Sequence, residues 1–270
     1  MDDRFSLNQI TTKAWSLPEA VAGCAGAGVG WIGLWRDKVA ETGLDETASL
    51  LKEYGVRVSS LCRGGFFTGV MPDGSPVDGV TQTREAIDDA QRLGADVLVL
   101  VVGGVANGDL ARSRQLVDDA VGELAPYAGE RGVRLGLEPL HPMQCADRSV
   151  LSTVDQALVI AEQHPAEQVG VIVDEFHVWW DPRIEESIAK AAGRIAGFHV
   201  CDQLVPLPDP LLGRGLPGDG PIDHRHLRAC VEAAGYTGPI EVEVFNAELW
   251  QRPGAQVLAE TIEAYRRYVA

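Results

Sequence analysis

Four segments of the chain end in a side chain that can bind a metal ion or transfer a proton. Each such side chain follows a short apolar run, as in residues 169–174, where branched residues and one glycine lead to a carboxylate. A run of this kind predicts a strand that is buried on both faces, as in a parallel sheet. The four residues are Glu138, Asp174, His199 and Glu243. Parallel α/β proteins place their chemistry at the carboxyl ends of their strands, so we expect these side chains to meet.

Three carboxylates and one imidazole in the same space need a cation to balance their charge. This donor set suits Mn²⁺, Mg²⁺ or Co²⁺, whereas Zn²⁺ usually has more histidine or cysteine ligands. Each residue alone also has a structural explanation, since a strand-end carboxylate can cap a turn and a buried histidine can be a core residue. Four such residues on consecutive strands favour the metal site. Glu241 shares the inward strand face with Glu243, where it could act in the site or pair with Arg134 beneath it.

Eight alternations of a predicted strand and a predicted helix position these residues. The strands are predicted at residues 5–10, 29–34, 56–62, 96–102, 133–138, 169–174, 195–201 and 239–243. The helices are predicted at residues 18–27, 44–54, 81–93, 110–129, 153–163, 184–192, 223–234 and 255–268. This order predicts a single (β/α)8 TIM-barrel domain over residues 1–270, a fold of typically about 250 residues. A doubly wound open sheet is the alternative, but residues 11–15 lack the Gly-rich turn expected after its first strand.

The longest connections follow predicted strands, at residues 63–80, 139–152 and 202–222. In a barrel this asymmetry indicates that the carboxyl ends of the strands form the working face. Three residues at this face are candidates for substrate binding. Arg63 can hold a carboxylate or phosphate or remain solvated, and His141 can contact substrate or bond within its loop. Trp180 can form an aromatic wall against an apolar face of a substrate or pack in the core.

The composition argues against several classes of partner. Lys and Arg number 23 and Asp and Glu 39, and the formal net charge of −16 opposes binding to nucleic acid or to an anionic membrane. No apolar run approaches the roughly 20 residues of a spanning helix. The first residues lack the pattern of a secretion signal, and the five cysteines show no CxxC spacing. We therefore expect a reduced, cytoplasmic protein.

Several segments between residues 136 and 243 resemble the xylose isomerase-like TIM-barrel superfamily of sugar (phosphate) isomerases and epimerases, which includes D-tagatose 3-epimerase and inosose dehydratase. The matching segments are Gly136-Leu-Glu138-Pro, Asp174-x-x-His177, Phe198-His199-Val-Cys-Asp202, Arg214 with Pro217-Gly-Asp-Gly-Pro-Ile-Asp223, and Glu241-Val-Glu243. The order of these motifs is specific for the superfamily and weak for the substrate.

The resemblance implies that Glu138, Asp174, His199 and Glu243 hold one divalent ion, most often Mn²⁺, with Co²⁺, Mg²⁺ or Zn²⁺ as alternatives. It also implies that the two glutamates are an acid/base pair and that His177 and Arg214 contact substrate oxygens. One glutamate would remove a proton next to the carbonyl, and the other would return it to an enediolate. Relatives are often dimers or tetramers, so a homo-oligomer is expected.

The leading hypothesis is therefore a metal-dependent isomerase or epimerase of a small sugar or sugar derivative. The substrate is expected to be unphosphorylated, because Asp219 and Asp223 would repel a phosphate near the Gly-rich segment of the last long loop. A lyase on the same scaffold, which dehydrates a keto-inositol or eliminates from a 3-keto-glycoside, begins with the same proton abstraction. A repair endonuclease of the endonuclease IV type needs a histidine-rich trinuclear zinc cluster, which this chain does not supply. A non-catalytic sugar-binding barrel would not need the four ligand residues.

Overall fold

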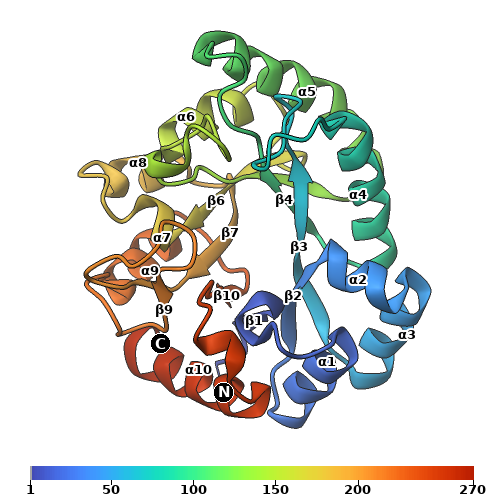
Figure 1. Ribbon diagram of the computed structural model, residues 1–270, viewed down its shortest axis with the longest axis vertical. Coiled ribbons are helices and arrows are strands. Elements are labelled where there is room, and N and C mark those ends of the chain that lie inside the picture. The colour runs from blue at the N-terminus through green and yellow to red at the C-terminus, as the bar shows by residue number, and fades with distance from the viewer. Residues whose placement is uncertain (1) are drawn as a thin grey trace.

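Eight strands pair in parallel, each with its neighbour around a ring, and the last pairs with the first, which closes the sheet into a barrel (Figure 1). The computed structural model describes residues 2–270. The barrel strands are β1 (Phe5–Asn8), β2 (Trp31–Trp35), β3 (Arg57–Gly65), β4 (Val97–Val101), β5 (Arg134–Leu137), β6 (Val169–Asp174), β7 (Ile195–Val200) and β10 (Ile240–Val242). The predicted TIM barrel is therefore confirmed.

Helices surround the barrel on its outer side (Figure 1). They are α1 (Leu17–Gly26), α2 (Arg36–Thr42), α3 (Leu44–Tyr54), α4 (Gly79–Leu93), α5 (Leu110–Glu130), α6 (Val154–Ala161), α7 (Glu175–Val178), α8 (Ile184–Lys190), α9 (His224–Ala233) and α10 (Gly254–Tyr268). Short 3-10 helices cover Gln9–Thr12, Pro142–Gln144 and Leu249–Gln251. Side-chain caps start several helices; Ser16 and Glu19, for example, form a reciprocal capping box at α1.

The structure differs from the predicted elements mainly at the working face. Helices α2 and α7 follow their strands without a loop and were not predicted, because each is short and lacks a turn signal before it. The long connection after β7 contains a small antiparallel pair, β8 (Asp202–Gln203) and β9 (Arg214–Gly215). Strand β3 continues beyond its predicted end to Gly65, whose φ of +122° favours glycine.

The inside of the barrel changes from apolar to polar towards the carboxyl ends of the strands. Cys62, Val97, Val99 and Ile172 form a small apolar cluster inside the ring. Gly136 leaves room for this packing, since a Cβ there would approach Cδ1 of Ile172 to 2.6 Å. Alternation then places Asp174, two residues after Ile172, on the same inward face. Apolar filling therefore supports the polar residues from below.

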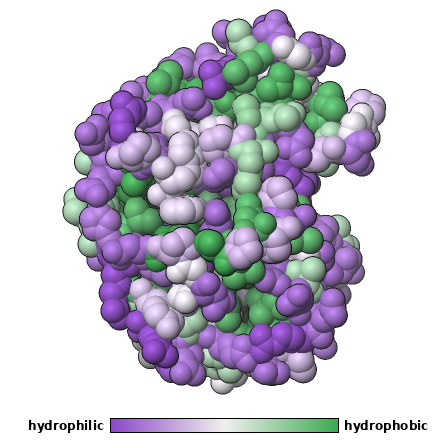
Figure 2. Space-filling model, turned by 60° about the vertical axis from the view of Figure 1, so that its left-hand side comes forward, coloured by the Kyte–Doolittle hydropathy of each residue, from purple (hydrophilic) through white to green (hydrophobic). Residues whose placement is uncertain are grey.

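The surface is mostly hydrophilic on the face shown in Figure 2, where apolar residues gather in patches and the outline is hollowed at one edge. Large exposed apolar side chains are scattered along the sequence, from Tyr54 to Tyr268. Among the helices formed by residues 2–270, none combines the length and the apolar character needed to cross a bilayer.

Candidate metal centre

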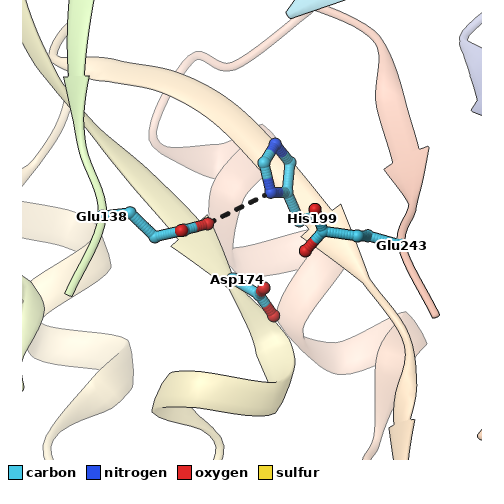
Figure 3. A group of neighbouring side chains, drawn as sticks. All are labelled: Glu138, Asp174, His199 and Glu243. Atoms are coloured by element: carbon cyan, nitrogen blue, oxygen red, sulfur yellow. Dashed lines mark ion pairs between the residues drawn. The ribbon is translucent and has the colours of Figure 1, made fainter. Parts of the chain in front are cut away.

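Four side chains from neighbouring strands converge at the carboxyl end of the barrel (Figure 3). Glu138 follows β5, Asp174 ends β6, His199 lies in β7 and Glu243 follows β10. One ligand atom from each lies within 4.8 Å of the ligand atoms of the others. None of the four is more than 6% exposed. The structure thus brings together the four residues that the sequence analysis selected.

The strand register explains why these residues meet. In the pairing of β6 with β7, Asp174 lies opposite His199. In the pairing of β10 with β7, His199 lies opposite Glu241, which places Glu243 two residues further along the same inward face. Asp174 also starts α7, because its side chain accepts a hydrogen bond from the backbone N–H of Phe176 at 2.9 Å. This bond fixes Oδ1 of Asp174, so that Oδ2 remains to face the other residues of the cluster.

Two buried atoms of the cluster have no hydrogen-bond partner among the described residues. They are Oε1 of Glu138 and Nδ1 of His199, which form an ion pair at 3.3 Å but make no hydrogen bond (Figure 3). Buried polar atoms nearly always have a partner, and a cation bound between these atoms would provide one. Three carboxylates with one imidazole also form a donor set that divalent ions accept. The residues present therefore fit a divalent metal ion.

The two glutamates of the cluster are held in an environment that favours their protonated forms. Burial raises the pKa of Glu138, and the neighbouring His199 offsets only part of this effect. Burial also raises the pKa of Glu243, to about 8, although the charges of Arg214 and His199 act in the opposite direction. A bound divalent ion would displace these protons, because carboxylates bind metal in their ionised form.

The surroundings favour the charged forms of Asp174 and His199. Burial would raise the pKa of Asp174, but the charges of Arg214 and His199 outweigh it and hold the pKa below its usual value. Burial would lower the pKa of His199, but the charge of Glu241 and the carboxylate of Glu138 raise it to about 10. The His199 imidazolium thus partly balances the carboxylates in the structure, a role that a metal ion would take over.

Arg214 reaches the cluster from β9, the strand of the small antiparallel pair. Its Nη1 atom donates to Oδ2 of Asp174 at 3.0 Å and to Oε2 of Glu243 at 2.9 Å. Its guanidinium carbon lies 4.6 Å from the ring centroid of Phe176 and 4.9 Å from that of Phe245. The long loop after β7 is therefore connected directly to two of the candidate ligands.

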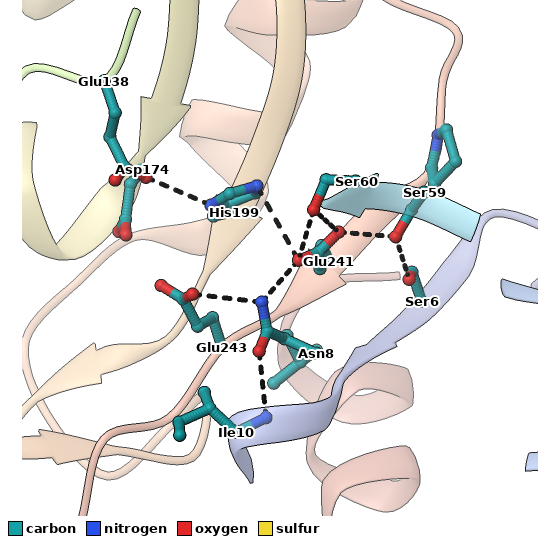
Figure 4. A network of polar contacts seen from close by, with 12 residues as sticks. Ser6, Asn8, Ile10, Ser59, Ser60, Glu138, Asp174, His199, Glu241 and Glu243 are labelled. Carbon is teal, nitrogen blue, oxygen red and sulfur yellow. Dashed lines mark hydrogen bonds and ion pairs between the residues drawn. The ribbon is translucent and has the colours of Figure 1, made fainter. Parts of the chain in front are cut away.

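A second layer of polar residues orients the cluster (Figure 4). Nδ2 of Asn8 donates to Oε1 of Glu241 at 2.6 Å and to Oε1 of Glu243 at 3.0 Å. Its Oδ1 accepts from Nε1 of Trp35 at 2.8 Å and from the backbone N–H of Ile10 at 3.0 Å. Both of these N–H groups can only donate, so the amide orientation is fixed and its NH₂ faces the two carboxylates.

Glu241 takes part in the site and does not pair with Arg134. Its carboxylate accepts hydrogen bonds from the hydroxyls of Ser59 and Ser60 and lies 3.9 Å from Nε2 of His199 (Figure 4). Arg134 instead donates to backbone carbonyl oxygens at the opposite end of the barrel. Gly33 makes this arrangement possible, because a Cβ at that position would overlap the Glu241 carboxylate. The alternative of an ion pair beneath the site is thus wrong.

A cavity of about 250 Å³ opens over the cluster. Among the predicted substrate-binding residues, it is lined by His177, Arg214 and Arg63. His141 and Trp180 do not line it and pack edge to face, with ring centroids 5.6 Å apart. Both support His177: the His141 backbone N–H donates to its Nδ1 at 3.1 Å, and Nε1 of Trp180 donates to its carbonyl oxygen at 2.7 Å.

The sequence analysis did not select several residues that line the cavity. Lys13 and Arg148 are among them, and they lie on loops without a recognisable motif. Cys62 lines it too, but burial raises the pKa of its thiol well above the usual value, so the thiol is protonated and not a nucleophile.

A separate buried cluster lies behind the centre and was also missed. His224 approaches Oε2 of Glu175 with its Nδ1 at 2.6 Å and Oδ2 of Asp202 with its Nε2 at 3.2 Å. Asp202 also accepts from the backbone N–H groups of Gly218 and Ile222. Through His224 and Asp202, these bonds connect Glu175, which directly follows Asp174, to both ends of the loop that carries Arg214. Glu175 was overlooked because it follows a strong candidate directly.

The xylose isomerase-like TIM barrel family matches residues 21–268. A Sinorhizobium meliloti 1021 protein of known crystal structure is 40% identical, with a TM-score of 0.93 over 99% of this chain and 98% of that chain.

Among curated proteins, a 3-dehydroshikimate dehydratase from Pseudomonas putida is 32% identical over 190 residues, which are 68% of this chain and 28% of that protein. An inosose isomerase from Bacillus subtilis is 30% identical over 137 residues, 49% of this chain and 48% of that protein. The matched segments thus span less than half the length of these relatives. With its closed barrel and its match over residues 21–268, the chain belongs to the xylose isomerase-like TIM barrel family.

Proposed function

We propose that this protein is a divalent-metal-dependent isomerase or epimerase of a small sugar or sugar derivative. The observation that carries the proposal is the buried cluster of Glu138, Asp174, His199 and Glu243 beneath an open cavity, in which two ligand atoms make no hydrogen bond. A bound ion would supply polarisation of the substrate carbonyl and stabilisation of the negative charge that develops on it. Mn²⁺ is the ion we expect, with Co²⁺, Mg²⁺ and Zn²⁺ as alternatives.

The two glutamates are suited to moving the proton. Glu138 and Glu243 come from different strands and face each other across the cluster (Figure 3). One accepts the proton from the carbon next to the carbonyl, and the other returns a proton to the opposite face of the same carbon or to its neighbour. Burial raises the pKa of both, which opposes the lowering that a bound ion would cause and keeps them basic enough to accept a proton.

His177 and Arg214 are placed to bind substrate oxygens. Both line the cavity, and Nη2 of Arg214 lies 3.0 Å from Nε2 of His177. Trp35 and Phe245 form apolar walls of the same cavity, with ring centroids 5.6 Å apart. Such walls suit the apolar face of a small ring and exclude water from the reacting carbon.

A dehydratase is the second candidate, because the Pseudomonas putida relative named 3-dehydroshikimate dehydratase matches 68% of this chain. The same glutamate would remove the proton next to the carbonyl. The other would protonate a hydroxyl on the adjacent carbon, so that a C–H and a C–O bond break, a C=C bond forms and water leaves. Dehydration of a keto-inositol and elimination from a 3-keto-glycoside are reactions of this type.

The test combines elemental analysis with proton exchange. Purified protein is stripped with chelator, reloaded with Mn²⁺, Co²⁺, Mg²⁺ or Zn²⁺, and incubated with ketoses and cyclic hydroxyketones in D₂O. We expect one ion per chain and metal-dependent deuterium incorporation next to the carbonyl. Isomerisation leaves the substrate composition otherwise unchanged, whereas dehydration releases water and yields a conjugated enone.

Two variants make this test specific. Glu243→Gln should lose both the ion and the exchange, and Glu248→Gln, an exposed glutamate nearby, should lose neither. Exchange that survives chelation, or protein that binds no ion after reloading, would contradict the proposal.

A further inference from the structure

Besides Arg214, the lining of the cavity over the candidate metal centre has three cationic side chains, which we call the cationic wall. They are Lys13, Arg63 and Arg148, on segments that follow β1, lie in β3 and follow β5. Arg63 also lines an adjoining cavity of about 270 Å³, together with Trp35 and Asp37. In a chain with a formal net charge of −16, three cations at one wall are not explained by the overall charge.

The two arginines of this wall have no oxygen acceptor among the described residues. The guanidinium of Arg63 contacts the ring of Phe66, with 4.5 Å from its central carbon to the ring centroid, and that of Arg148 makes no hydrogen bond or ion pair. Every other arginine that is buried or partly buried donates to a carboxylate or a backbone carbonyl oxygen. The guanidinium nitrogens of Arg63 and Arg148 have no acceptor among residues 2–270 and are not sealed off from solvent, so they are available to a ligand in the cavity.

The charges of these groups act on one another. Burial lowers the pKa of Arg63, and the charge of Arg148 lowers it further. Burial likewise lowers the pKa of Arg148, to which the charge of Arg214 also contributes. Arg148 is thus close enough to Arg63 and to Arg214 for like charges to repel, and the nearby carboxylates of Asp37, Glu138 and Asp147 do not cancel the lowering. An anion bound between the arginines would remove this repulsion.

We infer that Arg63 and Arg148 bind a carboxylate of the substrate, which makes the substrate a small hydroxylated carboxylic acid with a carbonyl group. The inference rests on the proposed function and names the substrate class of the same site. Each guanidinium presents a planar fork that matches a carboxylate. A phosphoryl group, with close to two negative charges, fits less well, because Asp37 lines the same cavity.

This assignment also orients the substrate. The cationic wall and the four candidate metal ligands border one cavity of about 250 Å³, which is small beside the roughly 300–1,000 Å³ of sites for drug-sized ligands. A compact molecule held by its carboxylate at Arg63 and Arg148 then directs its carbonyl and hydroxyl groups towards Glu138 and Glu243. Anchoring at a distance from the reacting carbon is the arrangement expected where remote binding energy positions the substrate.

The test is a comparison of matched probes by isothermal titration calorimetry. The pairs are shikimate with methyl shikimate, quinate with methyl quinate, and D-gluconate with D-glucitol; none of these molecules has a ketone, so none can react. We expect at least one anion to bind roughly tenfold or more tighter than its neutral partner, and inorganic phosphate to bind more weakly than that anion. The carboxylate assignment is overturned if no pair shows this preference, or if phosphate binds tighter.

Substitutions then locate the preference. Arg63→Gln and Arg148→Gln should each weaken the preferred anion by roughly tenfold or more and leave its neutral partner unaffected. Arg63→Lys should recover only part of the loss, because lysine keeps the charge without the fork. Arg84→Gln makes the same charge change at an arginine paired with Glu123, outside the cavity, and should bind like wild type. An equal loss in Arg84→Gln would assign the effect to overall charge and contradict the site.

Metal content is measured on the same samples. This separates the proposal of a metal-dependent enzyme from the inference of a carboxylate-binding site. Full metal loading without a preference for carboxylates would overturn this inference and leave the proposed function standing. A preserved preference in protein that binds no metal would overturn the proposed function and leave the anion site standing.

Discussion

Nη2 of Arg214 lies 3.0 Å from Nε2 of His177 at the edge of the candidate metal centre. The other ring nitrogen of His177 faces the backbone N–H of His141 at 3.1 Å. A guanidinium and a backbone N–H only donate, and a neutral imidazole can accept at one nitrogen only. The ring therefore faces one donor too many. A substrate oxygen that enters between Arg214 and His177 would accept from both and remove this conflict.

The first prediction is that His177 stays neutral in the folded protein. Burial lowers its pKa to about 3, and the charge of Arg214 adds to this, although Asp174 acts in the opposite direction. In NMR spectra of protein with labelled histidine, the ring resonances of His177 should not titrate between pH 5 and 8. They are assigned by their loss in His177→Gln, and the same sample in denaturant should titrate near the ordinary value of about 6.5. A normal titration in the folded state would contradict the burial argument.

The second prediction is that metal removal lowers thermal stability. The cluster holds three buried carboxylates, and an ion that binds only the folded chain stabilises it by about 2.7 kcal/mol at 100 times its Kd. For a protein of this size, that corresponds to roughly 5–10 °C in Tm. Calorimetric melting of chelated and reloaded protein measures the difference. Asp174→Asn should show little or no shift on reloading, and an equal shift in that variant would place the ion elsewhere.

The third prediction concerns Asn8, which positions Glu243 without being a ligand. In Asn8→Ala, the Glu243 carboxylate loses its hydrogen bond at 3.0 Å and can turn away from the centre. Loss of an outer partner of this kind typically lowers metal affinity by about 10- to 100-fold. Trp35→Phe removes the Nε1 donor that fixes the Asn8 amide, so a smaller loss in the same direction is expected. Metal titrations give both values, and unchanged affinity in Asn8→Ala would show that Glu243 is oriented by other means.

The fourth prediction is a decrease of stability with pH from the His224 cluster. Burial lowers the pKa of His224, but the hydrogen bonds to Asp202 and Glu175 raise it to about 9. Because the folded pKa lies above the unfolded value of about 6.5, the stabilisation is complete below pH 6.5 and is lost as the pH rises through 9. Burial raises the pKa of Glu175 from 4.5 to about 7, so its folded form also binds an extra proton, but this contribution is lost between about pH 4.5 and 7 and mostly precedes the loss at His224.

Urea unfolding between pH 6.5 and 9, at saturating metal, measures this decrease. At about 1.4 kcal/mol per pKa unit, His224 accounts for at most on the order of 3 kcal/mol. His224→Gln should flatten the profile, whereas His164→Gln, outside the cluster, should not. Parallel profiles for wild type and His224→Gln would show that the cluster does not hold an extra proton.

The barrel and the meeting of the four candidate ligands could be predicted because both depend on local patterns. An apolar run that ends in a carboxylate or histidine indicates a buried strand and its working end, and parallel strands place those ends together. The residues around the ligands depend instead on contacts between distant segments. Asn8 and Glu243 meet only because β1 pairs with β10, and neither strand records its partner in its own sequence.

Loop residues were harder still to assign. Arg148 reaches the cavity because its loop is held in place from outside, for instance by the hydrogen bond from Nε2 of Gln144 to the carbonyl oxygen of Pro210 at 3.0 Å. Trp180 was predicted at the substrate, yet the turn of α7 directs it towards His141 and the backbone of His177. Spacing along the chain cannot distinguish these outcomes, because each is decided by packing against a segment elsewhere in the sequence.

The four candidate ligands come from β5, β6, β7 and β10, which are neighbours in the ring, whereas Lys13, Trp35 and Arg63 come from the side formed by β1, β2 and β3. Reaction chemistry and most of the opposite wall are thus encoded in different parts of the gene. A mutation in the first quarter of the sequence can alter which molecule is held while the donor set stays intact. Descendants of such a protein could change their substrate in single steps and keep the same chemistry throughout.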